Sequence, residues 1–428
     1  MHSPWAGGVA LVVFALLALL LANLRATADT YHHLLESHLT IGFDNFRLSK
    51  SLEEWINDGL MVIFFFYIGL EIKREVIAGR LSTIRQASLP LAAAIGGMAV
   101  PALIYFAVNP SGPYASGWGV PTATDIAFAL GILSLMGNRV PVSLKVFLTA
   151  LAIVDDLGAI VVIALFYSTG IDLWMLGAAA LVFMLMLVLN RINVYRMRYY
   201  LIPSVVLWIL FLYSGVHATI AGVLIALTIP STPRFSKRYF GFKARYYLNS
   251  FRQHDSENVE VLCNRRQLED LEMIRQIAGN AISPSQRLEY GLHHVVAFFI
   301  MPVFALANAG VAIEGLGDLR VLASPQGLGI FLGLVLGKPL GIFLFSRLSV
   351  ALGWSSLPEG ASWRALFSVA CLGGIGFTMS IFINNLAFAD PQTVSQGKIA
   401  ILVASFAAVW VSLLCMRVLL RRKKDPDA

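Results

Sequence analysis

VFLTALAIVDDLGAIVVIALFY, residues 146–167, is apolar and long enough to cross a lipid bilayer as a single helix. Two adjacent acids, Asp155 and Asp156, lie at the middle of this run. An ionised carboxylate at the centre of a bilayer costs about 2.5–3.5 kcal/mol, so an adjacent pair at that depth needs a compensating reason. Neighbouring residues on a helix point about 100° apart, so we expect the two carboxylates to meet different partners and to have two roles.

The rest of the chain is apolar as well. Of its 428 residues, 57% are hydrophobic and only 13% are charged, and the mean hydropathy is +0.73. These values predict a polytopic membrane protein. The net charge of +7 could suggest a nucleic-acid partner, but the bases fall in short loops and at the C-terminus without interleaved aromatic residues. We therefore expect membrane lipid, and no nucleic acid, as the partner of these charges.

Twelve apolar runs of spanning length predict an all-α membrane protein of about twelve transmembrane helices. With twelve spans, 26 of the Lys and Arg residues fall on one side of the membrane and five on the other. Because bases are enriched on the cytoplasmic side, both termini are expected in the cytoplasm. One base, Lys338, lies at the centre of the tenth run and belongs to neither side. The runs are 5–24, 55–71, 88–108, 118–136, 146–167, 173–190, 199–213, 214–229, 291–313, 327–350, 364–386 and 396–418.

Two hydrophilic loops separate these runs. In the outer loop, residues 25–54, Leu39–Phe43 alternates in polarity before Asp44 and Asn45, which predicts a short β-hairpin. The cytoplasmic loop, about residues 231–290, mixes bases and acids. Its apolar spacing from 259 to 277 suggests a partly helical surface segment, but a solvated linker is the favoured interpretation. No separate soluble domain is evident, so residues 1–428 are predicted to form a single integral membrane domain.

Two triplets of spans, at about 86–167 and 327–420, are predicted to form an inverted repeat because they begin on opposite sides of the membrane. The middle span of each triplet is interrupted. Pro121 removes a backbone donor from one, and Gly373–Gly376 places three glycines in the other. Non-helical backbone at this depth is tolerated only where protein or water satisfies it, so two broken, crossing helices are expected to frame a site at mid-membrane.

Five polar residues are predicted at or near this depth: Thr124, Asp125, Asp155, Asp156 and Lys338. Asp125 and Lys338 could serve mainly as charge compensation for the dipoles of half-helices. For the two neighbouring acids, burial and mutual repulsion favour protons that exchange near neutrality. Once deprotonated, a carboxylate with the Thr124 hydroxyl, backbone carbonyls and water would offer oxygen ligands to sodium. A cation and protons that compete for one site, exposed to one side at a time, are sufficient for exchange transport without a chemical reaction.

Four motifs closely resemble those of the NhaA-type bacterial sodium/proton antiporters, and the likeness covers nearly the whole chain. They are PTATDIAFAL at 121–130, AIVDDLGAI at 152–160, GKPLG at 337–341 and GIGFTMS at 374–380. The resemblance implies an electrogenic secondary antiporter in the bacterial inner membrane that exchanges Na⁺ or Li⁺ for protons by alternating access. It also implies a role in sodium and pH homeostasis, no enzymatic activity and no cofactor.

The resemblance further implies roles for the mid-membrane residues. Asp156 is expected to be the principal carboxylate for cation and proton, with Asp155 beside it and able to pair with Lys338. Thr124 and Asp125 are expected where the broken helices cross.

A second set of residues matches the cytoplasmic region that the family associates with pH regulation, for which surface ion pairs at helix ends are the alternative. His217 also matches a family position, although a packed, hydrogen-bonded histidine at a helix start is another interpretation. The outer loop 25–54 could supply the family's dimer-forming hairpin. The cytoplasmic loop at about 231–282 is longer than in the best-known members. The regulatory set is Glu71, Arg74, Glu75, Arg287 and Glu289.

Two other functions could use membrane carboxylates. A cation channel also selects ions with acidic side chains, but the inverted triplets and the midplane lysine favour alternating access. An intramembrane aspartyl protease needs two carboxylates, which Asp125 and Asp156 could imitate. Neither acid lies in a Gly-x-Gly-Asp motif, which argues against the protease.

Overall fold

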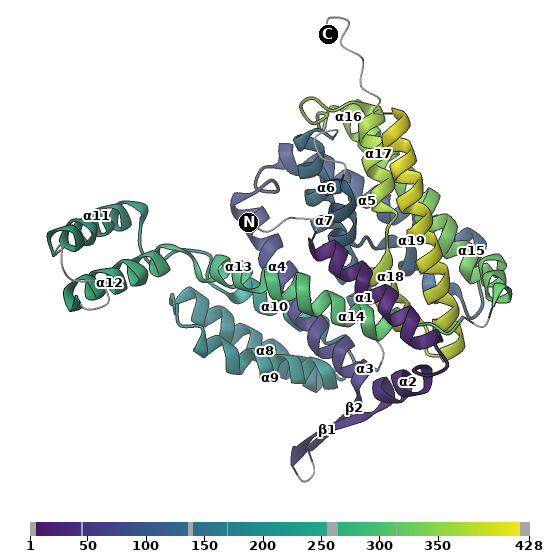
Figure 1. The fold of residues 1–428 in the computed structure, drawn as a ribbon, viewed down its shortest axis with the longest axis horizontal. Coiled ribbons are helices and arrows are strands. Elements are labelled where there is room, and N and C mark those ends of the chain that lie inside the picture. Colours follow the sequence, from purple (N-terminus) through teal and green to yellow (C-terminus); the bar gives the residue numbers. More distant parts are fainter. Residues whose placement is uncertain are drawn as a thin grey trace, which may run out of the picture.

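The computed structural model describes residues 6–43, 46–135, 140–168, 170–254, 264–313 and 315–419. Helices dominate this part of the chain and pack into one bundle, from which two hairpins project (Figure 1). One projection is the sheet formed by β1 (His38–Phe43) and β2 (Phe46–Ser51), which pair antiparallel. The predicted outer β-hairpin is therefore confirmed, with Asp44 and Asn45 outside the described residues.

The helices follow the predicted apolar runs, and each of the twelve ranges overlaps helix within the described residues. In order they are α1 (Ala6–Asn23), α2 (Ala28–Glu36), α3 (Leu52–Trp55), η1 (Ile56–Leu60), α4 (Met61–Ala78), α5 (Ile84–Val108), η2 (Ala115–Thr122), α6 (Ile126–Leu135), α7 (Val142–Phe166), α8 (Leu173–Arg191), α9 (Arg198–Tyr213), α10 (Thr219–Thr228), α11 (Lys237–Gln253), α12 (Arg265–Ala281), α13 (Pro284–Val295), η5 (Val296–Ile300), α14 (Met301–Asn308), η6 (Leu316–Ala323), α15 (Pro325–Leu332), η7 (Gly333–Gly337), α16 (Lys338–Ala351), α17 (Trp363–Gly373), α18 (Phe377–Ala387) and α19 (Pro391–Leu419).

Seven helical segments in the described residues are long and apolar enough to cross a membrane. The pair α17 and α18, bent by 47° at its break, makes an eighth if it is one span. Their length and composition confirm a largely helical, multi-pass membrane protein. The seven segments are Ala6–Asn23, Ile84–Val108, Val142–Phe166, Leu173–Arg191, Pro284–Asn308, Pro325–Ala351 and Pro391–Val418.

The helix that carries the two acids is the most enclosed of these segments. In α7, 67% of the apolar window is buried inside the protein, whereas in α8 only 11% is buried. Leucines and aromatic residues of α8 consequently point outward, as expected for a lipid-facing helix. The two acids thus lie in the interior of the bundle.

Both predicted helix interruptions are present, and they lie against each other. The amide of Asp125, in the break between η2 and α6, donates to the Ile375 carbonyl in the break between α17 and α18 (2.7 Å). The Ser380 hydroxyl donates to the Val120 carbonyl (2.8 Å). Each break thereby satisfies polar backbone groups of the other, which is the condition for unwound backbone in a membrane protein.

The long loop at about residues 231–290 forms a second projection. It folds into the helices α11 and α12, which lie side by side away from the bundle (Figure 1). The helical interpretation of this loop is thus confirmed from Arg265 onward, and the favoured interpretation of a solvated linker is wrong. Residues 259–263 lie outside the described part, and α11 was not predicted.

Candidate functional site

The two adjacent acids of α7 are both buried and have different surroundings. Asp155 Oδ2 accepts a hydrogen bond from Lys338 Nζ at 2.5 Å, and both side chains are 1% exposed. Lys338, the first residue of α16, also donates to the Thr122 carbonyl at the end of η2. One ammonium group thus compensates both a carboxylate and the negative end of a short helix.

Asp156 forms no ion pair with a described residue and lines a cavity of about 210 Å³. Its Oδ2 is buried and has no hydrogen-bond partner among the described residues. A buried carboxylate oxygen without a donor is costly, because desolvation is not offset by a hydrogen bond. The site therefore suits a proton or a small hard cation, either of which would satisfy that oxygen.

Two further acids face the same cavity. Asp125 reaches it from the break before α6, and Glu71 from α4. The remaining lining is largely apolar, with Phe64, Ile68 and Met301 among its residues. Acidic groups in an apolar enclosure interact strongly, since little water screens them.

Asp125 is fixed by the ends of two helices. It accepts hydrogen bonds from the Phe128 amide of α6 (3.0 Å) and from the amide (3.3 Å) and hydroxyl of Thr378 in α18. The carboxylate thus lies at two helix N-termini, where a negative charge is stabilised. This position matches the charge compensation considered for it from the sequence.

Thr124 lies at the crossing of the broken segments, as the resemblance implies. Its hydroxyl donates to the Gly373 carbonyl at the end of α17 (2.9 Å). Thr124 is buried but is absent from the residues that line the Asp156 cavity. In this structure the Thr124 hydroxyl therefore links the two broken segments. Of the residues predicted to bind the ion or proton, Asp156 and Asp125 share the cavity.

Four of the five predicted regulatory residues form one cluster at the ends of α4 and α13. Arg74 forms an ion pair with Glu289. Its Nη2 atom also lies 2.9 Å from Oε1 of Glu75 and 3.8 Å from Oε1 of Glu71. One base thus faces three acids, and Glu71 belongs to both this cluster and the Asp156 cavity. Arg287 is in no described ion pair, and its amide continues the helix by donating to the Ser283 carbonyl.

His217 lies apart from this cluster, at the start of α10. Its Nδ1 is 2.9 Å from the Thr219 hydroxyl, and its Nε2 is 3.8 Å from Asp58. The ring packs edge-on against Phe382. These contacts agree with a packed, hydrogen-bonded histidine at a helix start.

Sequence reasoning missed two groups of the site. Thr378 lies inside the quoted GIGFTMS motif, and its position directly after a glycine break is the signal for a helix-start hydroxyl. Tyr67 and His293 both line the cavity and form a hydrogen bond of 3.0 Å. They come from distant segments, α4 and α13, so no local pattern could have joined them.

Comparison with known proteins agrees with this arrangement. Residues 1–416 match the family model described as Na⁺/H⁺ antiporter 1. Three similar proteins are named Na⁺/H⁺ antiporter NhaA. The protein from Oleidesulfovibrio alaskensis is 50% identical (98% of this chain and 93% of that protein covered), that from Sulfurimonas denitrificans 45% (97% and 94%), and that from Escherichia coli 43% (98% and 97%). Because the likeness spans nearly the whole of both chains, the chain belongs to the Na⁺/H⁺ antiporter 1 family, whose named members are transporters and not enzymes.

Proposed function

We propose that this protein exchanges Na⁺ or Li⁺ for protons across the bacterial inner membrane, with Asp156 as the carboxylate that the cation and the proton occupy in turn. Family membership supports the exchange of Na⁺ and H⁺. The observation that carries the assignment to Asp156 is its unpartnered Oδ2 in a cavity, beside an acid that already has its own base.

The chemistry follows from competition at this oxygen. A protonated Asp156 carries no charge and cannot attract a cation, whereas the ionised form attracts one, so each ion displaces the other. Asp155 is held by Lys338, which leaves Asp156 as the acid free to exchange. A second proton for each Na⁺ would come from Asp155 after it separates from Lys338, and one net charge would then move per cycle, worth about 2.3 kcal/mol per 100 mV of membrane potential. Such exchange would be electrogenic.

We further propose alternating access through the two crossed breaks. They meet through a few hydrogen bonds, such as that from Asp125 to Ile375, and not through continuous helix. A contact of this kind can change while the flanking half-helices move as rigid bodies. The proposal includes twelve spans with both termini in the cytoplasm, a single domain over residues 1–428, and inverted repeats at about 86–167 and 327–420.

The charged cluster around Arg74 is proposed to regulate exchange by pH, and so to serve sodium and pH homeostasis. Glu71 supports this role because it belongs both to the cluster and to the lining of the Asp156 cavity. A change in protonation among Glu71, Glu75 and Glu289 would alter the electrostatic potential in that cavity. Arg287 and His217, which lie outside the cluster, stay predictions.

The variant Asp156→Asn tests the function. It keeps the shape of the side chain but removes the exchangeable charge, so Na⁺-driven proton movement in everted vesicles should fall to background. Asp172→Asn is the matched control, because Asp172 caps α8 by accepting from the Trp174 amide (2.8 Å), a bond that Asn can also accept. Undiminished exchange in Asp156→Asn would remove this residue from its role. Sodium current without coupled proton flux in the unaltered protein would indicate a channel.

A further inference from the structure

The helix α11 carries an unbalanced positive charge. It contains five bases and no acid. None of the five is in an ion pair with a described residue. In α12, by contrast, Arg265 pairs with Glu269 (3.2 Å) and Arg275 with Glu272 (2.6 Å). The bases of α11 are Lys237, Arg238, Lys243, Arg245 and Arg252.

Three of these bases form a stripe along the exposed side of α11. Arg238, Arg245 and Arg252 are spaced by seven residues, which places them on one side of the helix, and all three are exposed. Two aromatic residues flank the stripe, Phe242 (71% exposed) and Tyr246 (59% exposed). We call the three arginines the arginine stripe. A surface that joins cations to exposed aromatic rings is typical of helices that lie at a membrane interface.

The opposite side of α11 packs against α12. There Phe240, Tyr247 and Phe251 are half-buried, facing α12. Polar contacts close the end of the hairpin, with His254 Nδ1 3.3 Å from Asp270 and with the Asn264 side chain donating to the His254 carbonyl (2.7 Å). The pair is therefore a formed unit with the arginine stripe facing outward.

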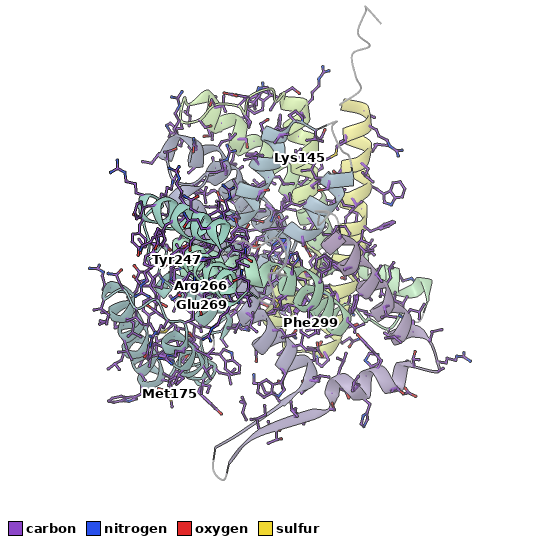
Figure 2. The ribbon with its side chains drawn as sticks, turned by 60° about the vertical axis from the view of Figure 1, so that its left-hand side comes forward. Lys145, Met175, Tyr247, Arg266, Glu269 and Phe299 are labelled. Carbon is purple, nitrogen blue, oxygen red and sulfur yellow. The ribbon has the colours of Figure 1, made fainter. Side chains whose placement is uncertain are left out.

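The hairpin is held close to the membrane helices at both of its ends. The Phe235 amide donates to the Asn280 carbonyl (3.0 Å), and the Ser285 amide to the Pro230 carbonyl (3.1 Å). Only a few residues separate these contacts from α10 and α13, and α13 opens a spanning segment. Figure 1 shows the hairpin beside the α13 end of the bundle, and Figure 2, which labels Tyr247 of α11 and Glu269 of α12, shows the same pair from another side.

We infer that α11 lies on anionic phospholipid at the cytoplasmic surface of the membrane, with the arginine stripe on phosphate groups and Phe242 and Tyr246 at headgroup depth. This inference rests on the orientation proposed above. Arginine binds phosphate through paired hydrogen bonds, and Tyr and Phe gain from partial burial at the interface. The few residues that join the hairpin to α10 and α13 keep α11 near the membrane and so raise the effective concentration of lipid around it. A soluble acidic partner would have no such advantage.

Hydrogen exchange on the full-length protein tests this inference. The protein is placed in nanodiscs of phosphatidylcholine alone or mixed with phosphatidylglycerol. Each basic residue near an anionic surface strengthens attachment by about fivefold, so three should together slow amide exchange in α11 by about a hundredfold when phosphatidylglycerol is present. High salt should remove this protection, since it screens the attraction. The salt experiment uses the unaltered protein and so is informative even if a variant hairpin unfolds.

The triple variant R238Q/R245Q/R252Q should lose the protection, whereas R265Q/R266Q/R275Q, which removes the same charge from α12, should retain it. Equal exchange of α11 in the two lipids would overturn the inference, as would equal loss in both variants. Protection by soluble polyglutamate but not by phosphatidylglycerol would assign an acidic protein partner instead. Na⁺-driven proton flux of the unaltered protein is measured in parallel. If the flux is intact but phosphatidylglycerol does not protect α11 from exchange, only this inference is contradicted. If α11 is protected but there is no flux, only the proposed function is contradicted.

Discussion

At the scale of single residues, the division of labour between Asp155 and Asp156 is the feature on which exchange depends. Adjacent residues on a helix face different directions, and here one acid meets Lys338 while the other meets a cavity. A single carboxylate in the same cavity could bind a cation, but Lys338 would then lack a counterion. The pair therefore separates the structural charge from the exchangeable one.

Removal of Lys338 tests this separation. Lys338→Ala leaves Asp155 as an unpaired buried acid, a loss of partner that costs about 3–5 kcal/mol of stability in comparable buried pairs. The melting temperature of the purified protein should fall, and the double variant Asp155→Asn/Lys338→Met, which removes both charges, should recover most of the loss.

Lys398→Ala is the matched control for this experiment. Lys398 pairs with Glu53 at 3.4 Å; Lys398 is 11% exposed but Glu53 is 35% exposed, so the loss should be smaller than that caused by Lys338→Ala. A Lys338→Ala protein that is as stable as the Lys398→Ala protein, with an unchanged pH profile of transport, would contradict the pairing with Asp155.

The sequence predicted much of this chemistry at the residue scale. Depth followed from the centres of apolar runs, so Asp155, Asp156 and Lys338 could be placed together without coordinates. The hydrogen-bond partner of Thr124 could not be predicted from the sequence, because its hydroxyl donates to the Gly373 carbonyl in a segment more than two hundred residues away. Hydrogen bonds between distant breaks depend on helix packing, which no local pattern records.

At the scale of elements, the close approach of α5 and α16 sets the position of Lys338. Gly96 and Gly341 face each other, and a Cβ at Gly341 would lie only 2.7 Å from the Gly96 carbonyl carbon. Neither backbone can move aside without shifting a whole helix. Since Lys338 lies one turn before Gly341, this contact positions Lys338 against α5, which also packs against α7, the helix of Asp155.

Gly341→Val should therefore disturb both folding and the site. Overpacking of this kind costs at least about 1–3 kcal/mol, and here the obstacle is backbone. We expect a lower melting temperature and reduced transport. Gly177→Val is the control, since Gly177 lies in α8 with no atom within 4 Å of the new Cβ. Equal melting temperatures for the two variants would show that this helix contact is unimportant.

Elements with strong apolar periodicity were predicted well, and those of mixed polarity were not. The interruptions at Pro121 and Gly373–Gly376 are present because these residues weaken a helix wherever they occur. The helix α11 was not predicted, and the expectation of bases without interleaved aromatic residues is wrong for it, since Tyr and Phe lie among its five bases. Such mixed polarity fits a linker until α12 covers one side.

At the scale of the whole molecule, the β-hairpin projects from the bundle (Figure 1). It leaves apolar side chains exposed. Leu39 and Ile41 lie on the same side of β1 and are 51% and 55% exposed. Exposed apolar residues on an open two-stranded sheet are typical of an association surface. We propose that loop 25–54 joins two copies of the chain into a homodimer.

The double variant Leu39→Lys/Ile41→Lys should convert the dimer into a monomer. Charges on this surface would repel their copies in the partner, and the mass in detergent, measured by light scattering, should halve. Ile171→Lys is the control, because Ile171 is similarly exposed (53%) but lies outside loop 25–54, between α7 and α8. A dimer that survives the double variant would exclude this surface as the interface.

The whole account depends on one property, the mutual exclusion of sodium and protons at Asp156. Its most direct test is proton release when NaCl is added to purified protein in weakly buffered solution with a pH indicator. The account predicts release from the unaltered protein, none from Asp156→Asn, and an apparent sodium affinity that falls as the solution is made more acidic, because protons then occupy the site. Sodium binding without any proton release, and with the same affinity at every pH, would contradict it.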